Sequence, residues 1–398
     1  MNDDHPAIDS AAAVSPLKVW IMISGLALTV FIFVTTSLMP MGLLPDIAAG
    51  LGRSEAVTGL IVTGYAWVSA ALTLPLTMLL ARFDRRTLLM AVLMVFILGH
   101  LLAARALDFN FMMLARALTA LAHAVLWGLA TPMAVSLAPE GRSSRALAAM
   151  STGVALSTIV GVPLGTLLGQ ALGWRAAFLA VGLAGLVLLL VLAVLLPKMP
   201  SDNPSPLKNL SLIAGRPRLW LIYSVTALAL CGHASAFTYF TPFMRTIGGF
   251  SPPDVVNFLL LFGLAGVAGS FLASTLTGRP AGAATALALL ILALSLGLAN
   301  QAAASGPVGA AVLCLIWGAA LSGAGILFQS AIFKTAPEAT DLGMSLYAVF
   351  FNLGIGGGAF IGGRVFEHFS LSAVTPGGAV FQILALLAFA LSWRRRGG

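Results

Sequence analysis

Long apolar runs alternate with short polar segments along the whole chain. An α-helix needs about 20 apolar residues to cross the hydrocarbon core of a membrane. Breaks at charged residues, Pro and Gly separate twelve such runs, at 19–44, 56–80, 88–104, 111–137, 146–168, 176–196, 219–243, 255–277, 281–299, 308–333, 344–363 and 373–393. The pattern therefore predicts an all-α integral membrane protein with twelve transmembrane helices.

The composition supports a membrane protein and excludes a soluble one. Residues of the set AVILMFWYC make up 59% of the chain and charged residues only 9%, whereas a soluble domain carries roughly 25% charged residues. The cations are dispersed and form no basic stripe, so we expect no nucleic-acid partner. Residues 1–16 lack the cationic start of a cleavable signal, and the run that follows is too long for one. We interpret that run as the first span.

One polar segment divides the chain. Residues 197–218 contain five prolines and four cations, which is typical of a solvated loop. We expect a tail at 1–18, a six-helix bundle at 19–196, a linker at 197–218, a second six-helix bundle at 219–393 and a tail at 394–398. An internal repeat agrees with this division, because Ala138-Pro139-Glu140 recurs as Ala336-Pro337-Glu338. Two parallel six-helix halves resemble the architecture of the major facilitator superfamily.

The distribution of cations predicts the orientation. With both termini on one side, the segments on that side hold 15 of the 21 Lys and Arg residues, the opposite side holds five, and Arg116 lies inside a span. Loops rich in Lys and Arg stay in the cytoplasm. We therefore expect both termini to be cytoplasmic.

The spans lack the usual proton carriers of coupled transporters. All thirteen carboxylates fall in loops, termini or helix ends. Cys231 and Cys314 lie in apolar runs with no metal-binding spacing. No nucleophile triad, zinc motif or phosphate loop is present, so we expect neither an enzyme nor a cofactor.

Polar residues at depth are the candidate binding residues. Arg116 and His123 are seven residues apart in the fourth run, which places them on one helix face. A charged group at that depth is costly unless it faces a cavity or a partner. We predict a substrate cavity there; the alternative is a His bonded to a carbonyl and an Arg that reaches the interface. The other predicted cavity residues are Ser37, Tyr65, Trp67, Trp127, His233, Tyr239, Thr241, Trp317, Gln329 and Asn352.

Separate sets of residues are the candidates for carrying protons and for controlling which side of the protein is closed. His123 and His233 are the only mid-span residues whose ordinary pKa lies near neutrality, so they are the predicted proton carriers. In the fifth run, glycines recur around Pro163, a pattern that predicts a close and kinked helix contact. We interpret this contact as one that sets which side of the protein closes more stably. The predicted gating residues are Arg82, Asp84, Arg85, Arg86, Gly153, Gly161, Pro163, Gly165 and Gly169.

Several local runs resemble one branch of that superfamily. They are Gly42-Leu43-Leu44-Pro45-Asp46-Ile47-Ala48, Tyr65-Ala66-Trp67, Ala122-His123-Ala124, Gly161-Val162-Pro163-Leu164-Gly165, Gly169-Gln170, Gly173-Trp174-Arg175, Pro242-Phe243 and Gly249-Phe250-Ser251. These runs are similar to sugar efflux transporters of the arabinose-exporter/SotB type, within the drug/proton antiporter branch. The resemblance implies a monomer in the bacterial inner membrane that exports sugars or related small solutes in exchange for protons.

The chain departs from that resemblance at its acidic positions. Ser37 and Thr241 stand where such transporters typically carry an acid, and Ala81 replaces the acid that precedes the basic loop between the second and third spans. An uncoupled facilitator and a multidrug exporter of amphiphilic compounds are therefore the alternatives.

Overall fold

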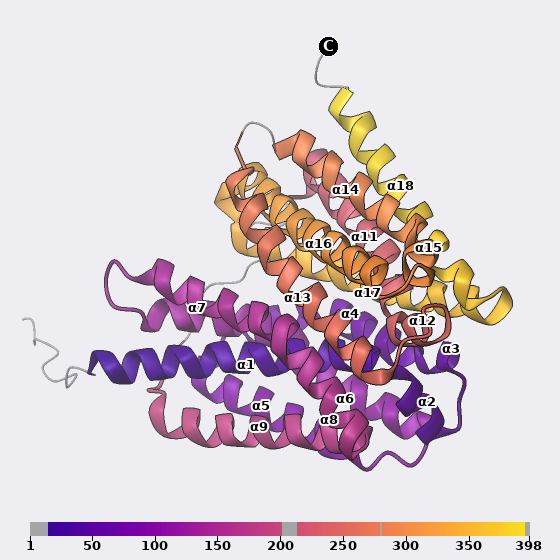
Figure 1. Cartoon of the computed structure of the whole chain (residues 1–398). Helices are drawn as coiled ribbons and strands as arrows, with labels where there is room; N and C mark the ends of the chain where they lie inside the picture. Colours follow the sequence, from indigo (N-terminus) through magenta and orange to yellow (C-terminus); the bar gives the residue numbers. More distant parts are fainter. Residues whose placement is uncertain (1–14, 201–212, 279–280, 395–398) are drawn as a thin grey trace, which may run out of the picture.

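The computed structural model describes residues 15–200, 213–278 and 281–394, and this part of the chain is helical apart from its connections (Figure 1). Eleven of its helices are long and apolar enough to cross a membrane, and Ala281–Gly297 is a shorter apolar helix. Each of these twelve helical segments corresponds to one predicted run. The prediction of an all-α membrane fold is confirmed.

The first half is built from six spans. They are α1 (Pro16–Gly42), α4 (Leu60–Leu80), α5 (Arg85–Ala104), α6 (Phe109–Leu137), α7 (Ser143–Leu156) continued by α8 (Val162–Leu172), and α9 (Trp174–Leu195). The short helices α2 (Leu44–Leu51) and α3 (Glu55–Thr58) connect the first two spans. The first span ends at Gly42, two residues earlier than predicted, and the chain continues from Leu44 as a separate helix.

The second half repeats this pattern. Its spans are α11 (Pro217–Phe237), α13 (Pro252–Thr275), α14 (Ala281–Gly297), α16 (Pro307–Thr335), α17 (Thr340–His368) and α18 (Leu371–Arg394). Two further helices, α12 (Phe240–Thr246) and α15 (Ala299–Ala304), lie between spans. The middle of the predicted linker, most of the N-terminal tail and residues 395–398 lie outside the described residues.

The two halves diverge toward the side on which α1 begins and α18 ends, which we call the terminal side. Figure 1 shows the start of α1 and the end of α18 far apart, whereas α2, α3 and α12 gather at the opposite side. The closest approach of the halves is thus on the side opposite the termini.

The glycines of the fifth span pack against α1. A Cβ at Gly153 would lie 2.3 Å from the carbonyl oxygen of Ala27, and one at Gly165 would lie 2.9 Å from the sulfur of Met39. Between α7 and α8, residues Ser157–Gly161 form a turn of π-helix (η1) directly before Val162 and Pro163. Proline supplies no backbone donor, so the local helical register changes at this point.

The basic loop between α4 and α5 anchors the start of the linker. The carboxylate of Asp84 caps α5 by accepting from the N–H of Thr87 (2.9 Å), and its other oxygen accepts from the N–H of Met199 (2.7 Å). The N–H of Arg85 donates to the carbonyl of Met199 (2.9 Å), and the guanidinium of Arg86 donates to the carbonyl of Ala193 (2.6 Å). Three of the predicted gating residues, Asp84, Arg85 and Arg86, thus bind the end of α9 or the start of the linker.

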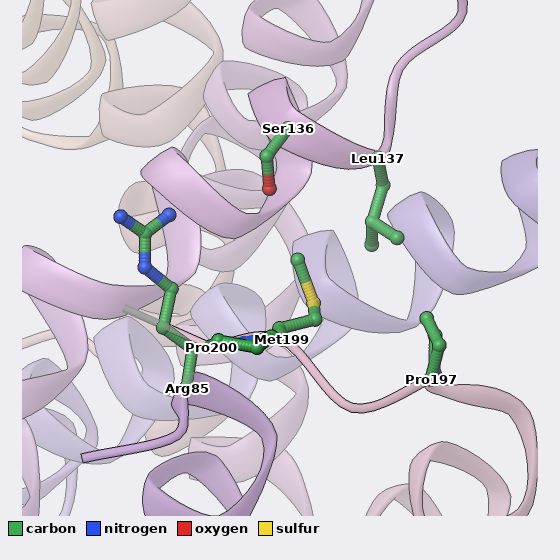
Figure 2. A pocket seen from close by; sticks show the side chains of 6 residues that line it. All are labelled: Arg85, Ser136, Leu137, Pro197, Met199 and Pro200. Atoms are coloured by element: carbon green, nitrogen blue, oxygen red, sulfur yellow. The ribbon is translucent and has the colours of Figure 1, made fainter. Parts of the chain in front are cut away.

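A cavity of about 310 Å³ adjoins this anchor. Figure 2 shows the side chains that line it, which are Arg85, Ser136, Leu137, Pro197, Met199 and Pro200.

We expect Asp84→Ala to lower the free energy of unfolding by about 1 kcal/mol, the usual effect of losing an N-cap. The pKa of Asp84 lies below its ordinary value of 3.8 because the N–H groups of Thr87 and Met199 bind the charged carboxylate. A lowered pKa stabilises the fold above about pH 4, and this contribution disappears as the pH falls through 3.8 and below. The difference in melting temperature between variant and wild type should therefore be present at pH 7 and shrink near pH 3.

The matched control is Asp108→Ala, because Asp108 caps α6 through Phe111 without touching the linker. Both variants should lose cap stability, but only Asp84→Ala should accelerate proteolysis at residues 197–218. Equal cleavage rates in the two variants would contradict the anchoring role.

Candidate functional site

A buried guanidinium lies at the centre of the first half. Arg116, on α6, is only 1% exposed. Its Nη1 donates to the carbonyl oxygen of Thr36 (3.0 Å) and approaches the hydroxyl of Thr36 (3.5 Å). The guanidinium carbon also lies 4.1 Å from the ring centroid of Tyr65 on α4. Arg116 is therefore held by neutral acceptors and an aromatic face.

The hydroxyl of Thr36 continues this network to a second buried residue, His100 on α5. Nδ1 of His100 lies 2.8 Å from the carbonyl of Phe96, so this nitrogen must be the donor. In the neutral ring Nε2 is then an acceptor, and it receives the hydroxyl proton of Thr36 over 2.8 Å. This leaves the lone pairs of the Thr36 hydroxyl available to Arg116.

A second pair extends the polar cluster along α6. The indole N–H of Trp127 donates to Nε2 of His123, one helical turn away (2.8 Å). The ring of His123 also meets the ring of Tyr65 edge-on, at 5.4 Å between centroids. Because Nε2 is an acceptor in this arrangement, the neutral ring carries its proton on Nδ1. Four of the predicted residues, Tyr65, Arg116, His123 and Trp127, thus form one cluster, which we call the Arg116 cluster.

The second half holds an aromatic cluster around His233 on α11. The His233 ring stacks on Phe237 (4.9 Å) and Phe262 (6.1 Å) and meets Trp317 edge-on (5.5 Å). Nδ1 of His233 and the indole nitrogen of Trp317 are buried and have no hydrogen-bond partner in the described part of the chain. Two further predicted residues, His233 and Trp317, are therefore brought together.

The remaining predicted residues lie elsewhere. The hydroxyl of Ser37 donates to the carbonyl of Val34 (2.8 Å), and the amide of Asn352 donates to the carbonyl of Ala348 (2.9 Å). Each thus bonds to its own helix. Trp67 lies against Phe360 of α17, at 5.8 Å between centroids, and Gln329 lies on α16.

Tyr239 and Thr241 join the two halves. The hydroxyl of Thr241 donates to the carbonyls of Met41 (3.1 Å) and Gly42 (3.0 Å) at the end of α1. The hydroxyl of Tyr239 lies within hydrogen-bond distance of the carbonyls of Ala56 (3.3 Å) and Ala359 (3.0 Å). The bonds to Met41, Gly42 and Ala56 join the two halves on the side opposite the termini, whereas Ala359 belongs to the same half as Tyr239.

Two more contacts cross between the halves. The amide of Gln170, near the end of α8, donates to the carbonyl of Pro252 at the start of α13 (3.4 Å). Gly263 of α13 lies so close to η1 that a Cβ would be 2.4 Å from the carbonyl oxygen of Thr158. The glycine thus permits backbone-to-backbone contact between the halves.

One residue of the hydrogen-bonded network around Arg116, His100, was not among the predicted cavity residues. Thr36 and His100 are 64 positions apart, so no periodic pattern connects them. The Trp127–His123 bond, by contrast, has the i, i+4 spacing at which helix side chains meet, and that spacing could have indicated it.

Comparison with known proteins identifies the family. The family model described as Major Facilitator Superfamily matches residues 26–359. A bacterial homologue of the human lysosomal transporter Spinster, solved inward-facing and occupied, has a TM-score of 0.73 at 16% identity over 96% of this chain and 98% of that chain. The same homologue, inward-facing and unoccupied, has a TM-score of 0.72 at 15% identity over the same shares.

A further structural relative is the human organic anion transporter MFSD10. It has a TM-score of 0.68 at 17% identity over 93% of this chain and 98% of that chain. At such identities these relatives show the fold alone, and the sugar-efflux branch stays a prediction. The match over residues 26–359 shows that the chain is a multi-pass membrane transporter of the Major Facilitator Superfamily.

Proposed function

We propose that this transporter exports sugars or related small solutes from the bacterial cytoplasm by alternating access, in exchange for protons. In this proposal both termini are cytoplasmic, as the cation distribution predicts. The solute binds between the two halves, and the Arg116 cluster and the His233 cluster supply contacts to it. An uncoupled facilitator and an exporter of amphiphilic drugs are the competing functions.

The one-sided closure of the two halves is the observation that supports alternating access most directly. The bonds of Thr241, Tyr239 and Gln170 and the contact at Gly263 cross between the halves on or toward the side opposite the termini. The helices α4 and α17 of the two halves also pack against each other, as at Trp67 and Phe360. Two bundles that meet on one side and diverge on the other can rock against each other.

Proton exchange has a structural requirement at His123. Its Nε2 accepts from the indole of Trp127, and its Nδ1 carries the proton of the neutral ring. A second proton can bind Nε2 only if this indole bond breaks. Proton uptake would therefore move the Trp127 side chain and so couple a proton to a conformational change.

The test is flux in proteoliposomes with and without an imposed pH gradient. Arabinose, a thiogalactoside and an amphiphilic drug are the solutes. Uphill sugar movement driven by the gradient supports the proposed antiport. Downhill sugar movement that does not depend on the pH gradient would indicate the facilitator. Drug flux without sugar flux would indicate the drug exporter.

We expect His123→Gln to reduce the gradient-driven component of flux at least tenfold and to leave downhill flux measurable. The amide retains a polar group but cannot bind a proton at neutral pH. His233→Gln is the comparison variant, because His233 lies in the other half and is the second candidate carrier. Gradient-driven flux that survives both substitutions would exclude histidine as the proton carrier.

A further inference from the structure

The Arg116 cluster contains buried donors that have no acceptor. Nε and Nη2 of Arg116, Nδ1 of His123 and the hydroxyl of Tyr65 are all buried without a hydrogen-bond partner among the described residues. A native interior leaves few polar groups unpaired, and each such group costs about 1–3 kcal/mol. Four such atoms in contacting side chains form a set of polar groups that a ligand can bind.

The chemistry of these atoms specifies the partner. A guanidinium can only donate. Nδ1 of His123 is also a donor, because the indole of Trp127 already occupies Nε2. The unpaired set is therefore rich in donors and poor in acceptors. A neutral sugar hydroxyl would bring a donor of its own, whereas a carboxylate accepts at both oxygens.

The positive charge of Arg116 also favours an anionic ligand. The described ion pairs of the protein join Arg216 to Glu338 and Arg364 to Glu367, both on exposed or partly exposed side chains. The partners of Arg116 are the Thr36 carbonyl and hydroxyl and the Tyr65 ring, all of them neutral. A buried cation without a counter-charge is strongly unfavourable, and it usually marks a functional position in a membrane protein.

We propose that the Arg116 cluster binds the anionic group of the solute, so that the solute is an organic monoanion such as a sugar acid. The carboxylate would pair with the free edge of the guanidinium and accept from Nδ1 of His123 and from the hydroxyl of Tyr65. One guanidinium matches one negative charge. This inference rests on the proposed function and narrows its solute class.

The position of Tyr65 connects anion binding to the halves. Its ring lies over the face of the guanidinium, so an anion at the guanidinium edge would also contact the side chain of Tyr65. Two residues further along α4, Trp67 contacts Phe360 of the other half. A displacement of Tyr65 that moves α4 would therefore change the contact between α4 and α17.

The test is equilibrium binding to the full chain in detergent, in a low-chloride buffer. Two pairs of an acid and its neutral counterpart serve as probes, galacturonate with galactose and benzoate with benzamide. We expect at least one acid to bind at least tenfold more tightly than its neutral counterpart. Arg116→Gln should remove that preference, Arg116→Lys should keep part of it, and Arg105→Gln should leave it unchanged, because Arg105 is an exposed cation of the same half.

A stability measurement keeps the test independent of folding defects. Without ligand, Arg116→Met should melt at the same temperature as wild type or higher, because it removes an uncompensated charge and keeps most of the volume. A strong loss of stability would show that the guanidinium is already compensated and would overturn the inference.

Other outcomes separate this inference from the proposed function. The inference is overturned if the acids and their neutral counterparts bind equally tightly and if Arg116→Gln does not change this binding. This holds even if neutral sugars are exported. Chloride that alone reproduces the effect of the acids also overturns it, since the anion is then a counter-ion and not the solute. Arg116-dependent binding of an acid that is never transported supports the binding site and contradicts export.

Discussion

Gly263→Val is expected to reduce transport at least tenfold and to leave each half folded. A Cβ at this position would lie 2.4 Å from the carbonyl oxygen of Thr158, 2.7 Å from its carbonyl carbon and 2.8 Å from the Cα of Ile159. All three are backbone atoms of η1, so no side-chain rotation relieves the overlap. Relief requires α13 to move away from η1, which separates the halves at a contact that closes the transporter.

The separation can be measured with spin labels on the side opposite the termini. Leu107 and Val308 are 87% and 76% exposed and lie in different halves. Labels at these positions, in a background without Cys231 and Cys314, should report a longer mean distance in Gly263→Val than in the parent protein. An unchanged distance together with unchanged flux would contradict the role of Gly263.

Two other glycines provide matched controls. A Cβ at Gly269 would lie 2.1 Å from the carbonyl oxygen of Ala319 on α16 of the same half, so Gly269→Val should lower the melting temperature of the protein. Gly325 has ordinary space, with only the Tyr347 hydroxyl at 3.8 Å, so Gly325→Ala should leave transport and stability close to wild type.

The double variant Thr241→Val/Tyr239→Phe is expected to shift the protein toward conformations open on the side opposite the termini. The carbonyl of Met41 lacks a helical donor because the residue four positions later is Pro45. The hydroxyl of Thr241 supplies that donor from the other half. The Thr241 bond and the longer bond of Tyr239 to Ala56 cross between the halves, and their loss amounts to about 1–2 kcal/mol, a shift of roughly fivefold to thirtyfold in the conformational equilibrium.

The same label pair at Leu107 and Val308 measures this shift as an increased population of the longer distance. The control is Thr226→Val on α11, because Thr226 is also buried but donates to the carbonyl of Ile222 in its own helix (2.8 Å). If Thr226→Val and the double variant give the same distance distribution, the cross-half bonds contribute nothing to closure.

At two positions where the resemblance leads us to expect acids, the chain carries hydroxyl residues. Ser37 and Thr241 replace the acids expected from the resemblance, and the structure uses both hydroxyls to bond backbone carbonyls, Val34 in one case and Met41 and Gly42 in the other. A hydroxyl does not gain or lose a proton near neutral pH, so neither residue replaces an acid as a proton carrier. The proposal above therefore assigns proton exchange to histidine.

Part of the candidate site could be predicted from sequence because it follows helix geometry. The spacing of Arg116 and His123 placed both on one face of α6, and both lie in the Arg116 cluster. The small residues of the fifth span predicted a close helix contact, and Gly153 and Gly165 do face α1. Because an α-helix has 3.6 residues per turn, the spacing of residues in the sequence predicts which of them share a face of one helix.

The sequence alone determined the twelve-helix membrane fold, because bilayer thickness fixes the length of apolar runs and the cost of charge in lipid confines the carboxylates to their ends. Only the tertiary structure decided which polar atoms have partners and which side of the protein is closed. The donors of Arg116 and Tyr65 and the bonds of Thr241 depend on helices that are distant in the chain. Contacts between residues up to 200 positions apart produce no local pattern in the sequence, since they arise only when separate helices pack together.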